Sequence, residues 1–268
     1  MKHEELTSIP ANRRSFLKGA GLTGLAAVAG AAMIGTEFAG QPAEALAPND
    51  TDILNFALNL EYLEAEFYAV ATYGATLVQL GILSKADESG PTTGGHVVPG
   101  FAGKPEAYIA TALRIDEIDH VRVLRAALGS SAVKKPAIKL DALGFGFGNI
   151  NDFLKLARAF EDTGVSAYLG AAPLITSKAY LAAAGAILAT EAQHAGNIRM
   201  LCIMKGIDPP ALDAKDVPPS PSKPFNVDKD ALSIPRTVSE VLNIVYHGGS
   251  CSGGFFPEGM NGSIACRS

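Results

Sequence analysis

The chain has 268 residues; 48% are hydrophobic and 18% are charged, and the formal net charge at pH 7 is -5. The apolar fraction excludes a disordered chain, and the acidic balance excludes a broad basic surface for nucleic acid. Three Cys are too few for a disulfide framework and lack zinc-site spacing. No apolar run of 20 residues follows the first 40, so we expect no membrane span in the processed protein.

The first 45 residues have the pattern of an export signal. Arg13 and Arg14 precede a weakly hydrophobic run, rich in Gly and Ala, from residue 19 to about residue 35. The paired arginines, followed by Phe-Leu-Lys, resemble a twin-arginine signal, and cleavage is expected after Ala45. We therefore expect a periplasmic or extracellular protein. An uncleaved membrane anchor is the alternative interpretation.

Four long helices are predicted by apolar residues that recur at helical spacing, over residues 52–73, 105–128, 152–172 and 177–205. Asn49 or Asp50 is expected to cap the first helix and Asn151 the third. Strictly alternating apolar and polar runs are absent, so no sheet is expected.

The links between these helices predict how they pack. The short link around Pro173 makes the third and fourth helices antiparallel neighbours. The 129–150 link is long enough to run beside a 24-residue helix, which is about 36 Å long. The sequence thus predicts an all-α four-helix bundle over residues 46–206, with a long crossover between the second and third helices.

Residues 207–268 form a Pro- and Gly-rich extension. Thr237 and Glu240 have the spacing of a capping box, which predicts a short helix extending to about Tyr246. In an oxidising compartment Cys251 and Cys266 either pair or remain free thiols.

Two copies of a Glu-x-x-His motif lie near the middle of predicted helices. They are Glu117 with His120, and Glu191 with His194. Residues three apart on a helix share a face, so each pair can reach one metal site. Arginines on these helices are expected to be solvated or to pair with Asp116 and Asp119.

The other two helices share a second pattern. Glu61 precedes Tyr68 by seven residues, and Glu161 precedes Tyr168 by the same interval. Seven residues are nearly two helical turns, so each Tyr lies on the same face of its helix as the Glu. This repeat favours Glu61 as the metal-facing carboxylate of the first helix. Glu64 remains a competitor or a neighbouring polar group, and the tyrosines are candidates for hydrogen bonds to the carboxylates.

The predicted site contains four carboxylates and two imidazoles at the centre of the bundle: Glu61, Glu117, His120, Glu161, Glu191 and His194. Four buried carboxylates need protons or cations, and two divalent ions would balance them. Oxygen and imidazole donors without thiolate suit iron or manganese. The sequence therefore predicts two metal ions, Fe or Mn.

This set of six residues, over about residues 50–206, resembles the ferritin-like superfamily, which includes bacterioferritin, rubrerythrin and manganese catalase. Residues 54–68 and 253–262 resemble its desiccation-related branch. The resemblance implies a dimetal centre and redox chemistry with O2 or peroxide, which is ferroxidase, peroxidase or catalase-like. A non-catalytic metal-binding stress protein is the alternative. A storage cage is less favoured, and a homo-oligomer is compatible with the sequence.

Overall fold

The computed structural model describes residues 48–267. The predicted export signal and its cleavage site lie outside the described residues. None of the described helices is both long and apolar enough to cross a membrane.

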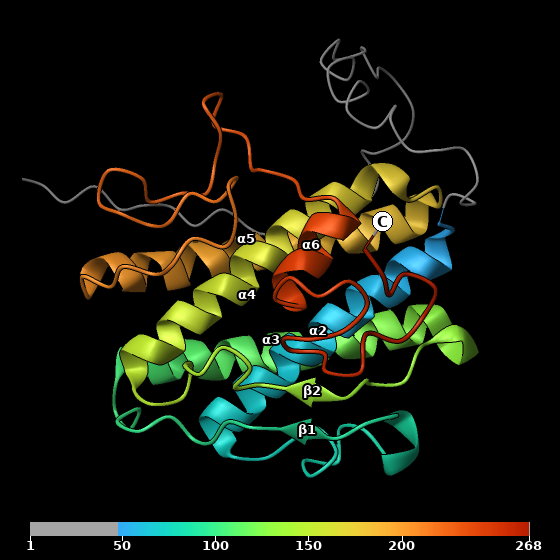
Figure 1. Cartoon of the computed structure of the whole chain (residues 1–268), viewed down its shortest axis with the longest axis horizontal. Coiled ribbons are helices and arrows are strands. Elements are labelled where there is room, and N and C mark those ends of the chain that lie inside the picture. The colour runs from blue at the N-terminus through green and yellow to red at the C-terminus, as the bar shows by residue number, and fades with distance from the viewer. Residues whose placement is uncertain (1–47, 268) are drawn as a thin grey trace, which may run out of the picture. The chain divides into compact units, whose positions relative to one another are not determined.

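Four long helices form the bundle (Figure 1), and the predicted all-α class is confirmed. They are α2 (Asp50–Tyr73), α3 (Pro105–Leu128), α4 (Ile150–Ala171) and α5 (Lys178–Met204), and a short helix α6 (Val238–Val245) follows. Three single-turn 3-10 helices lie in the connections, at Lys85–Asp87, Gly129–Ser131 and Ala172–Leu174. One parallel pair of two-residue strands, β1 (Thr92–Thr93) and β2 (Ile138–Lys139), was not expected from the sequence.

Capping residues explain where the helices begin and end. The Asn49 side chain accepts a hydrogen bond from the Asp52 amide at 3.1 Å, and Gly74 ends α2 in the left-handed conformation at φ 74°. The prediction that Asn151 caps α4 was wrong, because the Asn149 side chain accepts from the Asp152 amide and places Asn151 inside the first turn.

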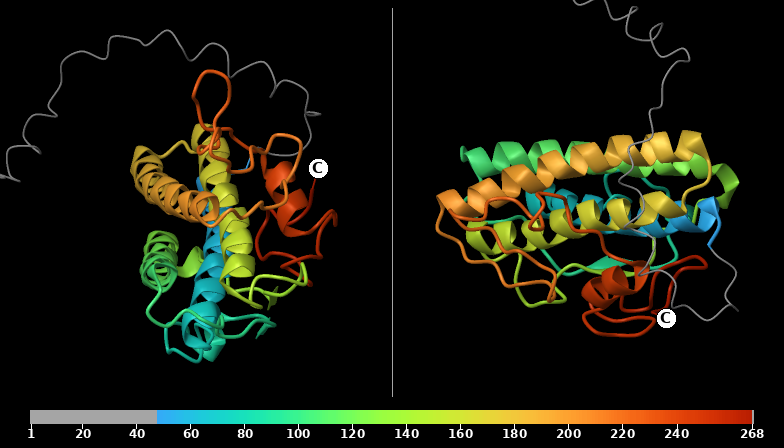
Figure 2. Two further views of the ribbon diagram at one scale, coloured as in Figure 1. Left: turned by 90° about the vertical axis from the view of Figure 1, so that its left-hand side faces the viewer. Right: turned by 90° about the horizontal axis from the view of Figure 1, so that it is seen from above.

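The long crossover runs along the bundle. Figure 1 shows the chain leaving α3 at one end, passing through β2 and entering α4 at the other end. Helices α2 and α3 pack as one closely contacting pair, and α4 and α5 as another (Figure 2). This arrangement brings the middles of all four helices to one level.

Helix α2 is buried along most of its length. The crossover and the C-terminal tail both bond to it: the Val133 amide donates to Asn55 at 2.9 Å, and Asn59 donates to the carbonyl of Asn261 at 2.8 Å. Because α2 is enclosed in this way, water is kept from its side of the bundle.

Buried arginines hold the segment 207–236 against α4 and α5. Arg158 on α4 bonds to Asp216 at 2.5 Å, and Arg199 on α5, which pairs with Asp162 of α4 at 2.7 Å, also donates to the carbonyl of Pro224 at 2.7 Å. Within the segment, Arg236 donates to Asp213 at 2.8 Å. A buried arginine is tolerated only when its charge is paired, so these contacts specify the path of the extension.

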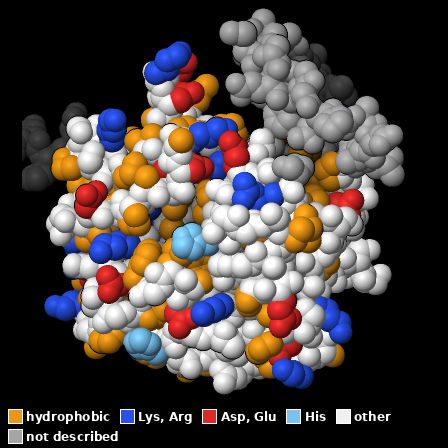
Figure 3. Space-filling model, viewed as in Figure 1, with side chains coloured by type: hydrophobic (Ala, Val, Ile, Leu, Met, Phe, Trp, Pro, Cys, Tyr) orange, Lys and Arg blue, Asp and Glu red, His pale blue; other side chains and the backbone are white. Residues whose placement is uncertain are grey.

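The tail beyond α6 closes on itself through a disulfide between Cys251 and Cys266, and Cys202 is a buried free thiol. On the face shown in Figure 3, acidic and basic side chains are interspersed with apolar ones, with no broad basic patch.

The close approach of the extension to α4 gives a stability test. A Cβ added at Gly170 would lie 1.9 Å from the carbonyl oxygen of Arg236, whereas one added at Gly185 on α5 would meet no atom within 4 Å. We expect Gly170→Ala to lower the free energy of unfolding by about 1–3 kcal/mol. We expect Gly185→Ala to raise it by up to about 1 kcal/mol. Urea denaturation measures both, and equal effects would contradict the described packing.

Candidate metal centre

The six predicted side chains converge at the centre of the bundle, and each is buried. Their donor atoms form two groups, each with all its atoms within 4.8 Å of one another. Glu61 and His120 belong to one group, and Glu161 and His194 belong to the other. Glu117 and Glu191 belong to both. Two donor groups that share Glu117 and Glu191 could hold two metal ions side by side.

In the first group His120 turns its Nδ1 atom toward three carboxylates. The Nδ1 atom lies 3.2 Å from Glu61, 3.1 Å from Glu117 and 3.4 Å from Glu191. Glu61 comes from α2, Glu117 and His120 from α3, and Glu191 from α5, so three helices must pack in register to form this group.

In the second group His194 repeats the arrangement. Its Nδ1 atom lies 2.8 Å from Glu117, 3.4 Å from Glu161 and 4.0 Å from Glu191. The two imidazole rings are 6.0 Å apart between their centroids. The two copies of the Glu-x-x-His motif thus contribute to two neighbouring groups of donor atoms.

The two tyrosines bond across the bundle. Tyr68 on α2 donates its hydroxyl to Glu161 on α4, and Tyr168 on α4 donates to Glu61 on α2 at 2.5 Å. The expected bonds to candidate ligand carboxylates are present, and each reaches the glutamate of the opposite helix. Burial, followed by the adjacent carboxylate, raises the pKa of both hydroxyls, so they remain hydrogen-bond donors.

Asp116 is a site residue that the sequence did not single out. Its carboxylate lies 3.1 Å from the outer nitrogen, Nε2, of His194. The sequence offered Asp116 as one of several possible partners for arginines, and the structure instead pairs it with His194. The expected Arg122–Asp119 pair is present at 2.7 Å. A carboxylate on the outer nitrogen fixes the ring so that Nδ1 faces the centre.

A family model described as a ferritin-like domain matches residues 49–203. The chain belongs to the ferritin-like family. It is also similar to the ferritin-like catalase Nec2 of Nesocodon mauritianus, with 24% identity over 272 aligned positions that cover 81% of this chain and 85% of that protein. These comparisons support the fold and a dimetal type of centre, while the role of each residue as a ligand stays a prediction.

The electrostatics of this ferritin-like centre test whether the residues fit metal ions. Burial, followed by repulsion between neighbouring carboxylates, raises the pKa of Glu191 well above its ordinary value. Burial likewise raises the pKa of Glu117 to about 7. Burial opposes protonation of His194, but the nearby carboxylates of Glu117 and Glu161 outweigh it and raise its pKa to about 12. Without a cation, the cluster must retain protons.

Several inward atoms also lack a hydrogen-bond partner among the described residues. They are Oε1 of Glu117, Oε2 of Glu161, both carboxylate oxygens of Glu191 and Nδ1 of His194. Buried polar atoms without partners are costly unless something unseen satisfies them. Two divalent ions would supply those partners and balance four carboxylates, so the residues present fit a dimetal group.

Glu64 lies beside this set without joining either group. It is buried, and a Cβ added at Gly164 would lie 3.3 Å from its Oε1 atom and 2.3 Å from Oε2 of Glu191. Gly164 occupies the position in α4 that corresponds to Glu64 in α2. The lack of a side chain there leaves room for both carboxylates. Glu61 belongs to a donor group and Glu64 lies next to the set, so Glu61 stays the predicted ligand of α2.

We expect Glu61→Gln and Glu161→Gln to weaken metal binding to a similar extent, because each removes one carboxylate from one group. Glu64→Gln should have a smaller effect, within the roughly 10–100-fold range of groups that support ligands. Metal content of the three purified variants, measured under one loading condition, makes the comparison. Loss of metal from Glu64→Gln alone, with Glu61→Gln fully loaded, would contradict the assignment.

Proposed function

We propose that the chain is an exported dimetal protein whose bound iron or manganese pair disproportionates hydrogen peroxide, converting two H2O2 into two H2O and one O2. The observation that carries this proposal is the sharing of Glu117 and Glu191 between the two donor groups. That geometry would hold two metal ions next to each other, which suits a two-electron substrate. The similarity to a protein named as a ferritin-like catalase supports peroxide over other oxidants.

Six residues would hold the ions: Glu61 and His120 for one, Glu161 and His194 for the other, and Glu117 and Glu191 between them. When bound, the metal pair would supply the two electrons that peroxide accepts and returns during disproportionation. Iron and manganese both suit carboxylate and imidazole donors.

The remaining residues position and shield this set. Tyr68 and Tyr168 hold one oxygen each of Glu161 and Glu61, which fixes those carboxylates. Asp116 orients His194. The buried surroundings exclude bulk water, which strengthens every charge interaction inside.

Peroxide would reach the centre from the side of α3 and α5. The two histidines are the most exposed of the six, with 10% of the His120 side chain and 5% of the His194 side chain accessible, against 0–1% for the four glutamates. Asp116 stands at the same place with 47% of its side chain exposed. A small polar substrate can therefore approach past the imidazoles.

The test uses metal-loaded protein and measures O2 release from hydrogen peroxide. Wild type should release one O2 for two H2O2 consumed. Glu117→Gln and Glu191→Gln should lower kcat by about 100-fold or more, because each change affects both metal positions. Glu258→Gln, which alters an exposed carboxylate in the tail, is the matched control and should be unchanged.

Protein that holds two ions per chain and leaves peroxide unchanged would contradict the catalytic proposal. That outcome would support the alternative of a non-catalytic metal-binding protein in stress or desiccation, the alternative that the resemblance to the desiccation-related branch supports.

Export through the paired arginines is a separate proposal, supported by the sequence pattern around Arg13 and Arg14. We expect Arg13→Lys combined with Arg14→Lys to leave the precursor in the cytoplasm, because the twin-arginine pattern requires both. Fractionation followed by N-terminal sequencing measures this. A wild-type exported protein that still begins at Met1 would contradict cleavage after Ala45.

A further inference from the structure

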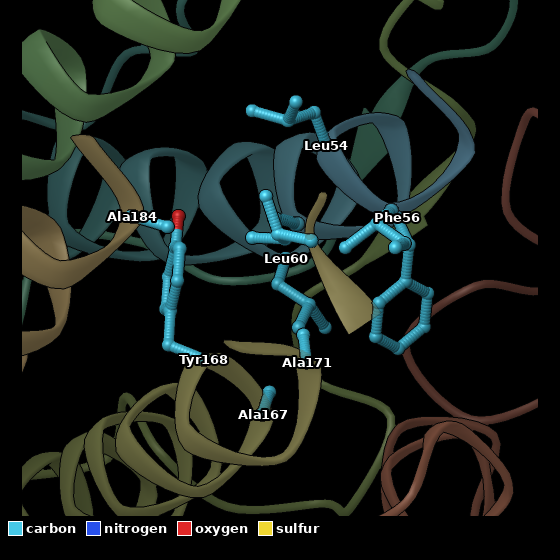
Figure 4. Close-up of a pocket in the computed structure, with 10 residues that line it drawn as sticks. Leu54, Phe56, Leu60, Ala167, Tyr168, Ala171 and Ala184 are labelled. Atoms are coloured by element: carbon cyan, nitrogen blue, oxygen red, sulfur yellow. The ribbon is translucent and has the colours of Figure 1, made fainter. Parts of the chain in front are cut away.

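A cleft open to solvent lies between the end of α2, the turn that follows it and the middle of α3. Its volume is about 330 Å³, at the lower end of the range of small-molecule sites. The hollow between α2, α4 and α5 that Figure 4 shows beside Tyr168 is much smaller, about 20 Å³, and is too small for such a ligand. None of the six predicted metal ligands lines the larger cleft, so it is separate from the candidate metal centre.

Apolar and aromatic side chains form most of the lining of this cleft. Leu80 and Ile82 come from the turn after α2, and Ile115 and Ile118 come from α3. Tyr73, the last residue of α2, is 66% exposed and Ile115 is 50% exposed, so part of this apolar surface faces water. A ligand with an apolar body would remove that surface from water, which favours binding.

Arg114 supplies a positive charge that no acidic side chain balances. Its guanidinium lies 5.3 Å from the centre of the Tyr73 ring and donates one long hydrogen bond, of 3.4 Å, to the hydroxyl of Thr72. Asp116, two residues further along α3, pairs with His194 instead. Among the described residues Arg114 has no ion pair, so most of its five N–H donors are available to a ligand.

A second arginine adds to this charge. Arg122 lies about two turns after Arg114 on the same side of α3 and also lines the cleft. Its partner Asp119 lies 2.7 Å away, but both side chains are more than half exposed, and an ion pair of that kind is weak. The charged residues of the lining are these two arginines, so the cleft favours an anion.

We propose that this cleft binds a small amphipathic carboxylate, with its carboxylate on Arg114 and its apolar body against Ile115 and Ile118. Arginine offers two parallel N–H donors that match the two oxygens of a carboxylate. A neutral apolar molecule would leave the guanidinium without an anion, and inorganic phosphate would leave the apolar walls in water. A ligand that carries both groups satisfies both features. The proposal goes beyond the metal chemistry and does not depend on it.

Isothermal titration calorimetry of the metal-loaded protein with octanoate tests this proposal. We expect one octanoate per chain, and we expect 1-octanol, which lacks the charge, to bind about tenfold more weakly because it loses a charge-assisted contact. Acetate lacks the apolar body and should also bind at least about tenfold more weakly. Acetate that binds as tightly as octanoate would place the contact at the metal ions or another cation and would overturn the proposal.

Three variants locate the binding. Arg114→Gln should weaken octanoate binding about tenfold. Ile115→Glu places a negative charge in the wall at a half-exposed position and should weaken binding to a similar extent, which provides a test where the first variant does not fold. Arg267→Gln removes an exposed arginine of the tail and is the matched control, with unchanged binding. No saturable binding of octanoate by wild type, or equal binding by a folded Arg114→Gln, would overturn the proposal.

Discussion

Four carboxylates and two imidazoles at the centre of an apolar bundle impose the constraint on which the rest of the structure depends. Glu61, Glu117, Glu161 and Glu191 cannot all be ionised there without balancing charge, and protons or cations must supply it. Contacts around these six side chains hold them in place. The tail and the crossover enclose α2, and two tyrosines hold carboxylates across the bundle.

The bundle is a doubled two-helix unit whose halves differ at the site. Glu64 on α2 has Gly164 as its counterpart on α4, and a side chain at Gly164 would collide with Glu191. Asp116 precedes Glu117 and bonds to His194, whereas the corresponding Thr190 donates to the carbonyl of Ala186 within its own helix. The two candidate metal positions therefore have similar donors and different neighbours. If both positions bind metal, unequal neighbours would give the two ions different affinities and potentials.

The sequence predicted those features that depend on local spacing. The Glu-x-x-His pairs, the seven-residue Glu-to-Tyr interval and the helix boundaries follow from one helix at a time, and the structure reproduces them closely. Contacts between residues far apart in the sequence could not be predicted from the spacing within one helix. His194 meets Asp116 across 78 residues, and fully buried Lys135 donates to the carbonyl of Gly90 and lies 3.4 Å from Glu88. The sequence pattern placed the cap of α4 at Asn151, whereas the structure uses Asn149, two residues earlier, because either asparagine can accept a hydrogen bond from a helix amide.

The central claim is that two metal ions lie between the four glutamates and the two histidines. Anomalous X-ray scattering at the iron and manganese edges, from crystals of protein purified from its native compartment, tests it most directly. The account predicts two peaks per chain, one beside Glu61 and His120 and the other beside Glu161 and His194. A fully ordered site with no anomalous peak, or with peaks elsewhere in the chain, would contradict it.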